Sequence, residues 1–411
     1  MAILNKQDPQ IAKLIKLEDK RQQDDIVLIP SENYASAAVR EALGTRLSNK
    51  YSEGYSHKRY YSGNQIIDSV EDIAKERAIK LFKCKFANVQ AYSGSPANMA
   101  IYMALMEPGD TVMGLSLPHG GHLTHGWPVN FSGKFYKSVQ YEVDKKTERL
   151  DLKKIGKLIR KTKPKMIFTG ATAYSRVWEW REFSKIAKSV KACLIADISH
   201  IAGLVVAGVH PSPFPYADVV MTTTHKTLRG PRGALILTNN EEIAQKIDKA
   251  VFPGLQGGPH DNQTAAIAVA LREAQGKPFR TYGAQIVKNA KELAKTLLAN
   301  NIRLVSGGTD NHLILIDLGA SGPTGKDMQN ALYEAGLSTN KNTVPNETRS
   351  PFVTSGIRIG TPAITTRGMK EPQMRLIGSF IAQIIKDPEN ESLRKEIKKE
   401  VLELTKRFPT P

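Results

Sequence analysis

Cysteine is scarce in this chain of 411 residues, which contains only Cys84 and Cys193. Two cysteines so far apart form neither a disulfide framework nor a metal-binding pattern, so we expect two reduced thiols. Long apolar runs are missing too, because no stretch approaches the roughly 18–20 residues of a membrane-spanning helix. The first 20 residues mix charges of both signs and lack the apolar segment of a signal peptide. These absences predict a cytoplasmic protein with no membrane partner.

Acidic residues are fewer than basic ones, 40 against 58, and the formal net charge is +18. Clustered lysines and arginines would indicate a nucleic-acid partner, because they release counterions from phosphates. Here the charge is scattered, and the dense segment 386–407 interleaves acidic residues without any nucleic-acid-binding motif. We therefore expect a solvated basic surface that attracts anionic ligands, and no specific nucleic-acid partner.

The hydrophobic pattern divides the chain into three parts. It predicts an amphipathic arm at residues 1–30, a large domain at 31–278 and a smaller α+β domain at 279–411, with a strand at 312–317. In the large domain, helical stretches alternate with short apolar runs, which predicts a mostly parallel sheet covered on both faces. The runs cover residues 111–115, 165–169, 193–196 and 218–222, and a break rich in Gly, Pro and Lys follows at 275–282.

Lys226 lies just after a predicted strand, 219–224, and a tight loop rich in glycine and proline follows it. A partly desolvated lysine loses its proton more easily and suits a Schiff base. Asp197 closes another apolar strand 29 residues earlier, where its carboxylate can face the ligand cleft at the carboxyl edge of the sheet. The ring nitrogen of pyridoxal 5'-phosphate (PLP) needs such an acidic partner. A surface lysine and a turn-capping aspartate are the alternatives for each residue alone, and the pair favours PLP.

Residues 93–96, Ser-Gly-Ser-Pro, precede a predicted helix with Ser95 as its cap and Pro96 at its first position. Backbone N–H groups and the positive end of a helix can hold a phosphate dianion. Hydroxyl-rich helix starts are common, so this segment alone indicates ordinary capping. Because Asp197 and then Lys226 follow it in the chain, the order matches that of fold-type I PLP enzymes.

A series of longer motifs runs through the chain: IPSENY (29–34), NKYSEGYSHKRYYSG (49–63), YSGSPAN (92–98), HGGHLTHG (119–126), TTTHKTLRGPRG (222–233), FPGLQGGP (252–259), SGGTDNH (306–312) and TSGIRIGTPA (354–363). With these motifs the chain resembles the serine hydroxymethyltransferase family over nearly its full length. The family often has alanine at the position of Ser199.

The resemblance implies an α/β fold of fold type I (aspartate aminotransferase-like), with a mostly parallel seven-stranded sheet in the large domain and a smaller C-terminal α+β domain. It implies reversible transfer of the serine hydroxymethyl group to tetrahydrofolate, giving glycine and 5,10-methylenetetrahydrofolate by way of a PLP aldimine and quinonoid. It also implies a homodimer with shared active sites.

The same resemblance assigns cofactor-binding residues. Lys226 carries PLP covalently, Asp197 binds its ring nitrogen and His122 stacks on the ring. Ser93, Gly94 and Ser95 hold the phosphate. Tyr51 and Gly258 of the neighbouring subunit complete the phosphate site. The other residues of the cofactor pocket are Thr172, His200, Thr223 and His225.

The substrate side is assigned in the same way. A guanidinium fork suits the α-carboxylate of an amino acid, which points to Arg358, and Ser31 adds a hydroxyl. Glu53, held protonated in a closed pocket, would move protons at the serine hydroxyl and the folate nitrogens, and a solvated surface glutamate is the alternative. Tyr61 and His200 complete the substrate site. The full catalytic set is Lys226, Glu53, Asp197, Tyr61 and Thr223, and the folate-binding positions are Tyr60, Leu117, Gly121, Leu123 and Asn342.

Several competing interpretations are weaker. His119, His122 and His125 have the right chemistry for zinc, but the glycines between them argue against a rigid site, so we expect no metal. Segment 321–326 lacks the first glycine of a nucleotide-binding loop and predicts a turn that opens a helix. A folate-independent PLP aldolase is opposed by the folate-side residues. An RNA-binding protein with a lapsed active site is opposed by the intact catalytic residues.

Overall fold

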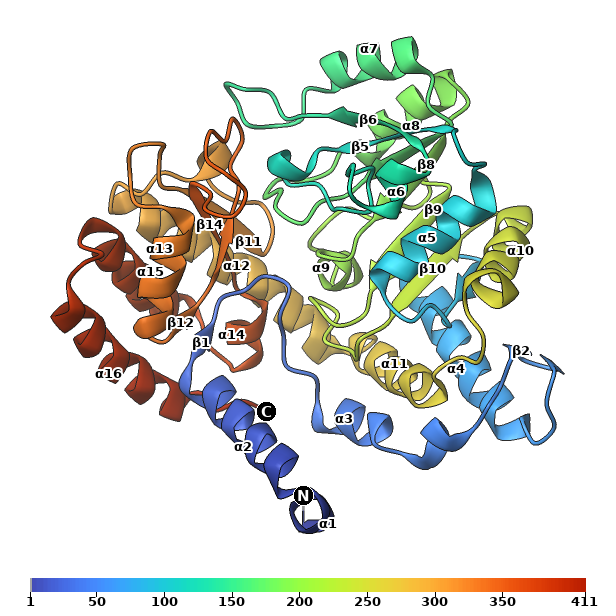
Figure 1. Ribbon diagram of the computed structural model, residues 1–411, viewed down its shortest axis with the longest axis horizontal. Coiled ribbons are helices and arrows are strands. Elements are labelled where there is room, and N and C mark those ends of the chain that lie inside the picture. The colour runs from blue at the N-terminus through green and yellow to red at the C-terminus, as the bar shows by residue number, and fades with distance from the viewer. Residues whose placement is uncertain (1) are drawn as a thin grey trace.

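Two hydrophobic cores organise the chain, and the computed structural model describes residues 2–411 (Figure 1). One long helix, α12 (Lys277–Ala299), belongs to both cores. Its first half contributes Phe279 and Ile286 to the core of the large sheet, and its second half contributes Leu293 and Leu297 to the core of the C-terminal region. This helix therefore fixes how the two regions sit against each other.

The larger core surrounds a seven-stranded sheet in which only β10 runs antiparallel to its neighbours. This confirms the predicted mostly parallel sheet. In spatial order the strands are β4 (Phe86–Asn88), β10 (Ala234–Thr238), β9 (Val219–Thr223), β8 (Cys193–Asp197), β7 (Met166–Thr169), β5 (Thr111–Leu115) and β6 (Lys137–Tyr141).

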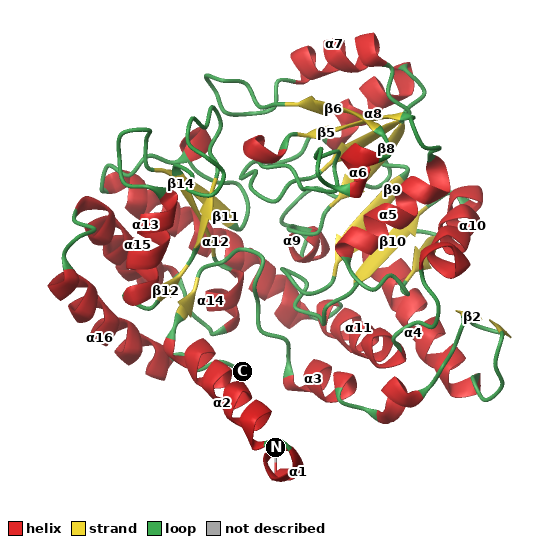
Figure 2. Cartoon of the chain, in the orientation of Figure 1, coloured by secondary structure: helices red, strands yellow, loops and turns green. Residues whose placement is uncertain are grey.

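Helices cover both faces of this sheet, which explains why its strands are continuous apolar runs (Figure 2). Along β7, Ile167 faces one core cluster, and Met166 and Phe168 face the other, because successive side chains alternate across a strand. The first cluster includes side chains from α4 (Gln65–Phe82), α7 (Leu152–Thr162), α8 (Trp180–Ser189), α9 (Ala202–Val206) and α11 (Asp261–Ala274). The second includes side chains from α5 (Gly94–Leu105) and α10 (Glu241–Lys249).

The predicted runs at 111–115, 165–169, 193–196 and 218–222 are strands β5, β7, β8 and β9, displaced by at most one residue at either end. The predicted cap at Ser95 is wrong, because Ser93 is the N-cap and α5 begins at Gly94. Pro96 lies within the first turn instead of starting it, and a first turn tolerates proline since its N–H groups have no helical partner. The predicted break at 275–282 is also shorter, since only residues 275 and 276 separate α11 from α12.

The smaller core lies under an antiparallel sheet in the order β11 (Leu313–Asp317), β14 (Gly356–Gly360) and β13 (Asn340–Asn342). The strand predicted at 312–317 is β11, and the turn predicted at 321–326 opens α13 (Gly325–Glu334), whose N-cap is Thr324. Three further helices of this C-terminal region are α14 (Pro362–Thr366), α15 (Glu371–Lys386) and α16 (Glu391–Arg407).

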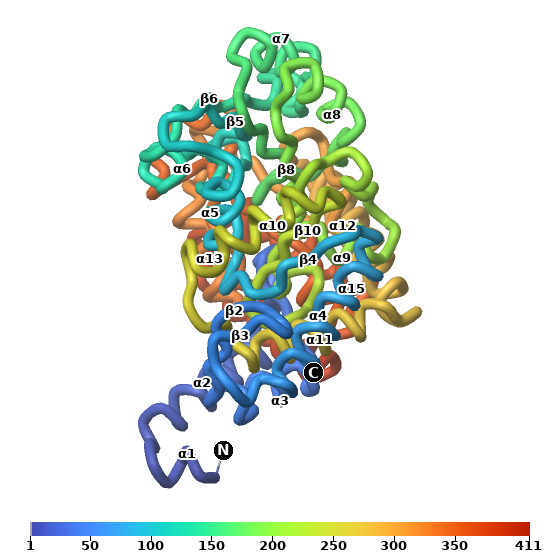
Figure 3. The backbone as a smooth tube through the Cα atoms, turned by 90° about the vertical axis from the view of Figure 1, so that its right-hand side faces the viewer, coloured from blue at the N-terminus to red at the C-terminus, as the bar shows by residue number. Residues whose placement is uncertain are grey.

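The N-terminal segment consists of α1 (Ala2–Gln7), α2 (Pro9–Asp24) and the short strand β1 (Ile26–Val27). β1 pairs in parallel with β12 (Leu337–Ser338), and Ile26 is buried in the smaller core. α1 projects from the rest of the molecule in both views (Figures 1 and 3). A short helix, α3 (Ala37–Leu43), and a hairpin of β2 (Gly54–Tyr55) and β3 (Lys58–Arg59) lead into the large sheet. No helix of residues 2–411 is long and apolar enough to span a membrane.

Candidate active site

One cavity of about 390 Å³ opens at the carboxyl ends of the parallel strands, between the two cores. Asp197 ends β8, Thr223 ends β9, and α5 begins at its rim, whereas Arg358 reaches it from β14 of the smaller sheet. Ligand sites of open α/β sheets lie at this edge. The predicted site residues that line it are Ser31, Ser93, Gly94, Ser95, His122, Thr172, Asp197, His200, Thr223, His225, Lys226 and Arg358.

Asp197 is buried at the floor of the cavity, and each of its oxygens is hydrogen-bonded. Oδ1 accepts from the Ser199 N–H at 3.0 Å and from the Ser199 hydroxyl at 2.6 Å. Oδ2 lies 3.1 Å from His125 Nε2 and accepts from the Asn98 amide at 3.1 Å. Burial alone would raise the pKa of Asp197, but His125 and Ser199 outweigh it and hold the pKa well below its usual range. Asp197 is therefore a fixed anion aimed into the cavity.

Lys226 has its side chain in the same cavity, directly after β9 and its two following residues. Burial lowers the pKa of Lys226 to about 8; Asp197 opposes this shift, and Arg358 and Arg232 add to it. The amine can thus lose its proton near neutral pH, which a free lysine does not do. This property suits a lysine that forms a covalent bond with an aldehyde.

The start of α5 offers free donors to an anion. Ser93 has an extended backbone and makes no side-chain cap, so its hydroxyl and the first N–H groups of the helix stay available. A side chain at position 94 would clash, because its Cβ would lie 2.7 Å from Thr223 Cγ2, and only glycine leaves room for a close approach. The helix end, the amine of Lys226 and the carboxylate of Asp197 together fit the phosphate, aldehyde and ring nitrogen of PLP.

Arg358 is the cation of the cavity that comes from the smaller sheet. Its Nη1 donates to the Thr172 carbonyl at 2.6 Å and its Nε to the Asn340 side chain at 3.1 Å. Burial lowers the pKa of Arg358 to about 10, so the guanidinium is still charged at neutral pH. It can therefore receive a carboxylate at the boundary between the two cores.

The three histidines of segment 119–126 have separate partners. His125 pairs with Asp197, His122 lies 2.7 Å from the Thr124 hydroxyl through Nδ1, and His119 is 3.8 Å from Glu142. Burial is the main reason why the pKa of His122 falls to about 4, so its ring is neutral. His122 faces the cavity as an uncharged aromatic ring.

The predicted folate-binding residues Leu117, Gly121, Leu123 and Asn342 lie on two segments, 117–123 and 340–342, and none of them lines the cavity. Thr172 joins the first of these segments, because its hydroxyl donates to the carbonyl of Gly121 at 3.0 Å. The neighbour of Asn342, Thr343, donates to the Pro118 carbonyl at 3.3 Å, next to Leu117. Leu123 is 40% exposed on the same segment as Gly121.

The predicted residues Tyr51, Glu53, Tyr60, Tyr61 and Gly258 do not line this cavity. The three tyrosines are 56%, 73% and 49% exposed. Tyr51 and Tyr61 lie edge to face with ring centroids 5.5 Å apart, and the charge of Glu53 raises the pKa of Tyr61. A Cβ on Gly258 would be 3.2 Å from the Tyr51 ring. These residues form a second cluster, which we call the tyrosine cluster, at the surface of the same chain.

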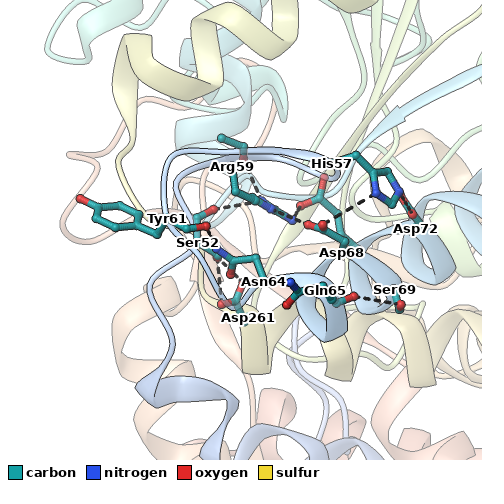
Figure 4. Close-up of polar contacts among 12 residues, drawn as sticks. Ser52, His57, Arg59, Tyr61, Asn64, Gln65, Asp68, Ser69, Asp72 and Asp261 are labelled. Atoms are coloured by element: carbon teal, nitrogen blue, oxygen red, sulfur yellow. Dashed lines mark hydrogen bonds and ion pairs between the residues drawn. The ribbon is translucent and has the colours of Figure 1, made fainter.

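A buried ionic network holds the loop that carries the tyrosine cluster (Figure 4). The Arg59 side chain is 3% exposed and donates to Asp68 at 2.8 Å and to Glu71 at 2.7 Å. Its other nitrogen donates to the carbonyls of Ser52 and Gly54, on either side of Glu53. Tyr61 points away from this network (Figure 4). The loop is thus fastened from behind while its aromatic side chains face outward.

Some residues of the cavity were not predicted from the sequence as part of the site: Glu32, His125, Ala171, Ser199, Met221 and Arg232. The sequence indicates His125 only as a possible metal ligand, whereas in the folded chain it is a partner of Asp197. Ser199, two residues after Asp197, binds its carboxylate through both its N–H and its hydroxyl. Arg232 lies 3.2 Å from His225 Nε2 and adds positive charge beside Lys226.

Comparison with known proteins gives a consistent result. A family model described as serine hydroxymethyltransferase matches residues 4–381. The chain is 55% identical over 417 aligned residues to a serine hydroxymethyltransferase of Acidothermus cellulolyticus, with 100% of this chain and 97% of that protein covered. It is 54% identical over 409 aligned residues to the enzyme of the same name from Methanosarcina barkeri, with 100% and 99% covered.

Proposed function

The chain belongs to the serine hydroxymethyltransferase family, and on that premise we propose how its residues divide the work of the reaction. It is a PLP-dependent transferase of fold type I that interconverts serine and glycine, with tetrahydrofolate as the acceptor or donor of the one-carbon unit. Two relatives at 54–55% identity, aligned over 97–99% of their own length and 100% of this chain, carry this conclusion and favour it over a folate-independent aldolase.

Most contacts to PLP would come from residues of one chain at the edge of the large sheet. The first turn of α5 would bind its phosphate, Asp197 its ring nitrogen and Lys226 its aldehyde carbon, with His122 against the ring. When bound, PLP supplies the electron sink that stabilises negative charge at the α-carbon of the amino acid. Asp197 would strengthen this effect, because a fixed anion beside the ring nitrogen keeps that nitrogen protonated.

The amino acid would lie between the two cores, with its carboxylate on Arg358. Ser31 and His200 line the same cavity and can add hydrogen bonds. Because Arg358 also donates to the Thr172 carbonyl, the orientation of the carboxylate is tied to the large sheet that holds the cofactor. Thr223 and His225 line the same cavity as Lys226 and would help to position it.

Proton transfer is assigned to Glu53 with Tyr61, and the folate ring to Tyr60, Leu117, Gly121, Leu123 and Asn342. Since the tyrosine cluster does not line the cavity of its own chain, we propose that it serves the cavity of a second copy in a homodimer. The exposure of Tyr51, Tyr60 and Tyr61 on an anchored loop supports this proposal, because large exposed aromatics commonly mark an interface. Tyr51 and Gly258 would then complete the phosphate site of the partner.

A cytoplasmic location is also proposed for this homodimer. Cys84 and Cys193 are both free thiols, which is typical of a reducing compartment.

The role of Glu53 can be tested with Glu53→Gln, which keeps the size of the side chain but cannot exchange a proton in the same way. We expect binding of glycine to be retained while folate-dependent turnover of serine falls by about a hundredfold or more, the usual range for a lost general acid–base group. The exposed Glu41→Gln is the matched control and should keep full turnover. A Glu53→Gln enzyme with unchanged kcat and only a raised KM for serine would make Glu53 a binding residue alone.

A further inference from the structure

His312 lies next to the cavity but does not line it. It is the residue just before β11, in the smaller sheet, and its side chain is fully buried. Its Nε2 is 3.2 Å from Nδ1 of His200, a residue that lines the cavity from the large domain. The two rings are nearly stacked, with centroids 5.4 Å apart. His312 therefore contacts a residue of the cavity lining, His200, without lining the cavity itself.

Both rings are neutral. Burial is the main cause that lowers the pKa of His312 to about 3 and the pKa of His200 well below its usual range, and the nearby charges of Lys226 and Arg358 act in the same direction. A neutral imidazole carries one N–H donor and one bare acceptor nitrogen. A hydrogen bond between two neutral rings then requires that one nitrogen of the pair donates and the other accepts.

The far nitrogen of His312 decides which of the two donates. Nδ1 of His312 is buried and has no hydrogen-bond partner among residues 2–411. If His200 Nδ1 donated, His312 would have to carry its proton on that isolated Nδ1. Buried N–H groups without an acceptor are rarer in proteins than buried acceptors with a free lone pair. His312 therefore carries its proton on Nε2 and donates it to His200 Nδ1.

This arrangement fixes the chemistry that His200 presents to the cavity. Because its Nδ1 accepts from His312, its only proton is on Nε2, the nitrogen that is left for the cavity side. We propose that His312 is a positioning residue that holds His200 as a hydrogen-bond donor toward the carboxylate of the bound amino acid, beside Arg358. The inference deepens the proposed function, since it rests on the substrate-binding role given to His200.

Neutron diffraction from crystals of the perdeuterated protein tests the tautomers directly and does not depend on activity. We expect deuterium on Nε2 of both His200 and His312 and none on either Nδ1. Deuterium on Nδ1 of His200 would overturn the inference, even if the protein is fully active. A protein with the expected tautomers that failed to bind glycine would instead contradict the proposed function.

Two variants of the whole holoenzyme test the consequence for binding. His312→Gln can still donate an amide N–H to His200, whereas His312→Leu cannot. We expect the KM for serine and the Kd for glycine to rise about tenfold in His312→Leu and to stay within about twofold in His312→Gln, the range of one neutral hydrogen bond. The kcat should change little in either, since the carboxylate contact is the same in ground and transition states. Equal weakening in both variants, or none in His312→Leu, would overturn the inference.

Discussion

At the scale of single residues, Lys226 shows how burial prepares a side chain for chemistry. The amine lies in a cavity with two arginines and one aspartate, and desolvation outweighs the attraction of Asp197. A lysine whose pKa is lowered to about 8 is mostly protonated at pH 7 and mostly neutral at pH 9. The neutral amine is the form that can bond to the cofactor aldehyde.

We therefore predict that covalent uptake of PLP by the apoenzyme accelerates with pH and then levels off. The rate should rise about tenfold between pH 7 and pH 9, because the neutral fraction of Lys226 rises by that factor around a pKa of 8. Borohydride trapping at timed intervals measures it, and Lys226→Ala should show no trapped cofactor at any pH. A rate that keeps rising beyond pH 10 would mean that Lys226 titrates as an ordinary exposed lysine.

The sequence predicted the residues whose signal is local and missed those whose role depends on a distant contact. Lys226 and Asp197 follow apolar strands, so their place at the carboxyl edge of a parallel sheet could be predicted. His312 could be placed near a strand, but its contact with His200 joins residues 112 positions apart and exists only in the folded chain. In the sequence, Ser199 is only a departure from the alanine that is common in the family. Its hydrogen bond to Asp197 could not be predicted, because it depends on the turn after β8.

At the scale of elements, apolar runs in the sequence predicted the bounds of several strands well, whereas the predicted helix starts were displaced. Strands β5, β7, β8 and β9 are buried on both faces, so each is a continuous apolar run with clear ends. Pro96 and Pro278 each led to a wrongly predicted helix start, because each lies inside the first turn of its helix. A first turn tolerates proline, so the residue marks a helix start only to within a few positions.

The ion pairs and hydrogen bonds of Arg59 hold the hairpin β2–β3 in place, and a substitution of Arg59 can test this. Arg59→Met would remove the buried cation that Asp68 and Glu71 share. Each carboxylate would keep one longer contact with a more exposed group, Asp68 with His57 at 3.8 Å and Glu71 with Lys75 at 3.5 Å. We expect a loss of about 3–5 kcal/mol in the free energy of unfolding, measured by urea denaturation, because unpaired buried charges are costly. Turnover should fall as well, since the loop bearing Glu53 loses two of its backbone anchors, while PLP stays bound.

The exposed Arg46→Met serves as the control for charge and side-chain type, and should change neither stability nor turnover. A stable Arg59→Met enzyme with full activity would show that the hairpin holds its shape without the ionic network. Arg59→Lys should recover only part of the loss, because a single ammonium cannot reach both carboxylates and both carbonyls.

At the scale of the whole molecule, the active site draws on regions that the sequence pattern separated. Arg358 comes from the smaller sheet and Asp197 from the large one, and Ser31 follows the N-terminal segment. The predicted boundary between residues 278 and 279 falls within the first turn of α12, a helix that belongs to both cores. The division into residues 1–30, 31–278 and 279–411 stays a prediction about how the chain is organised.

The last prediction is that a homodimer shares its active sites between the two chains. It rests on the separation of the cavity and the tyrosine cluster within one chain. Lys226 lines the cavity, and Glu53 lies in the tyrosine cluster outside it. Dimers of Lys226→Ala alone should be inactive, and dimers of Glu53→Gln alone should keep about one per cent of the turnover or less. A heterodimer of the two would hold one site with an intact lysine from one chain and an intact glutamate from the other.

Random refolding of an equal mixture should therefore restore about one quarter of wild-type activity, since half the dimers are mixed and each has one good site of two. The matched control mixes Lys226→Ala with Arg358→Met. Both residues line the cavity of the same chain, so no mixed dimer regains a complete site and activity should stay at the level of the parents. No recovery in the test mixture, despite heterodimers seen by native mass spectrometry, would mean that each chain builds its site alone and that the exposed tyrosine cluster has another purpose. Recovery in the control would instead mean that Lys226 and Arg358 act in one site from different chains, against the cavity seen here.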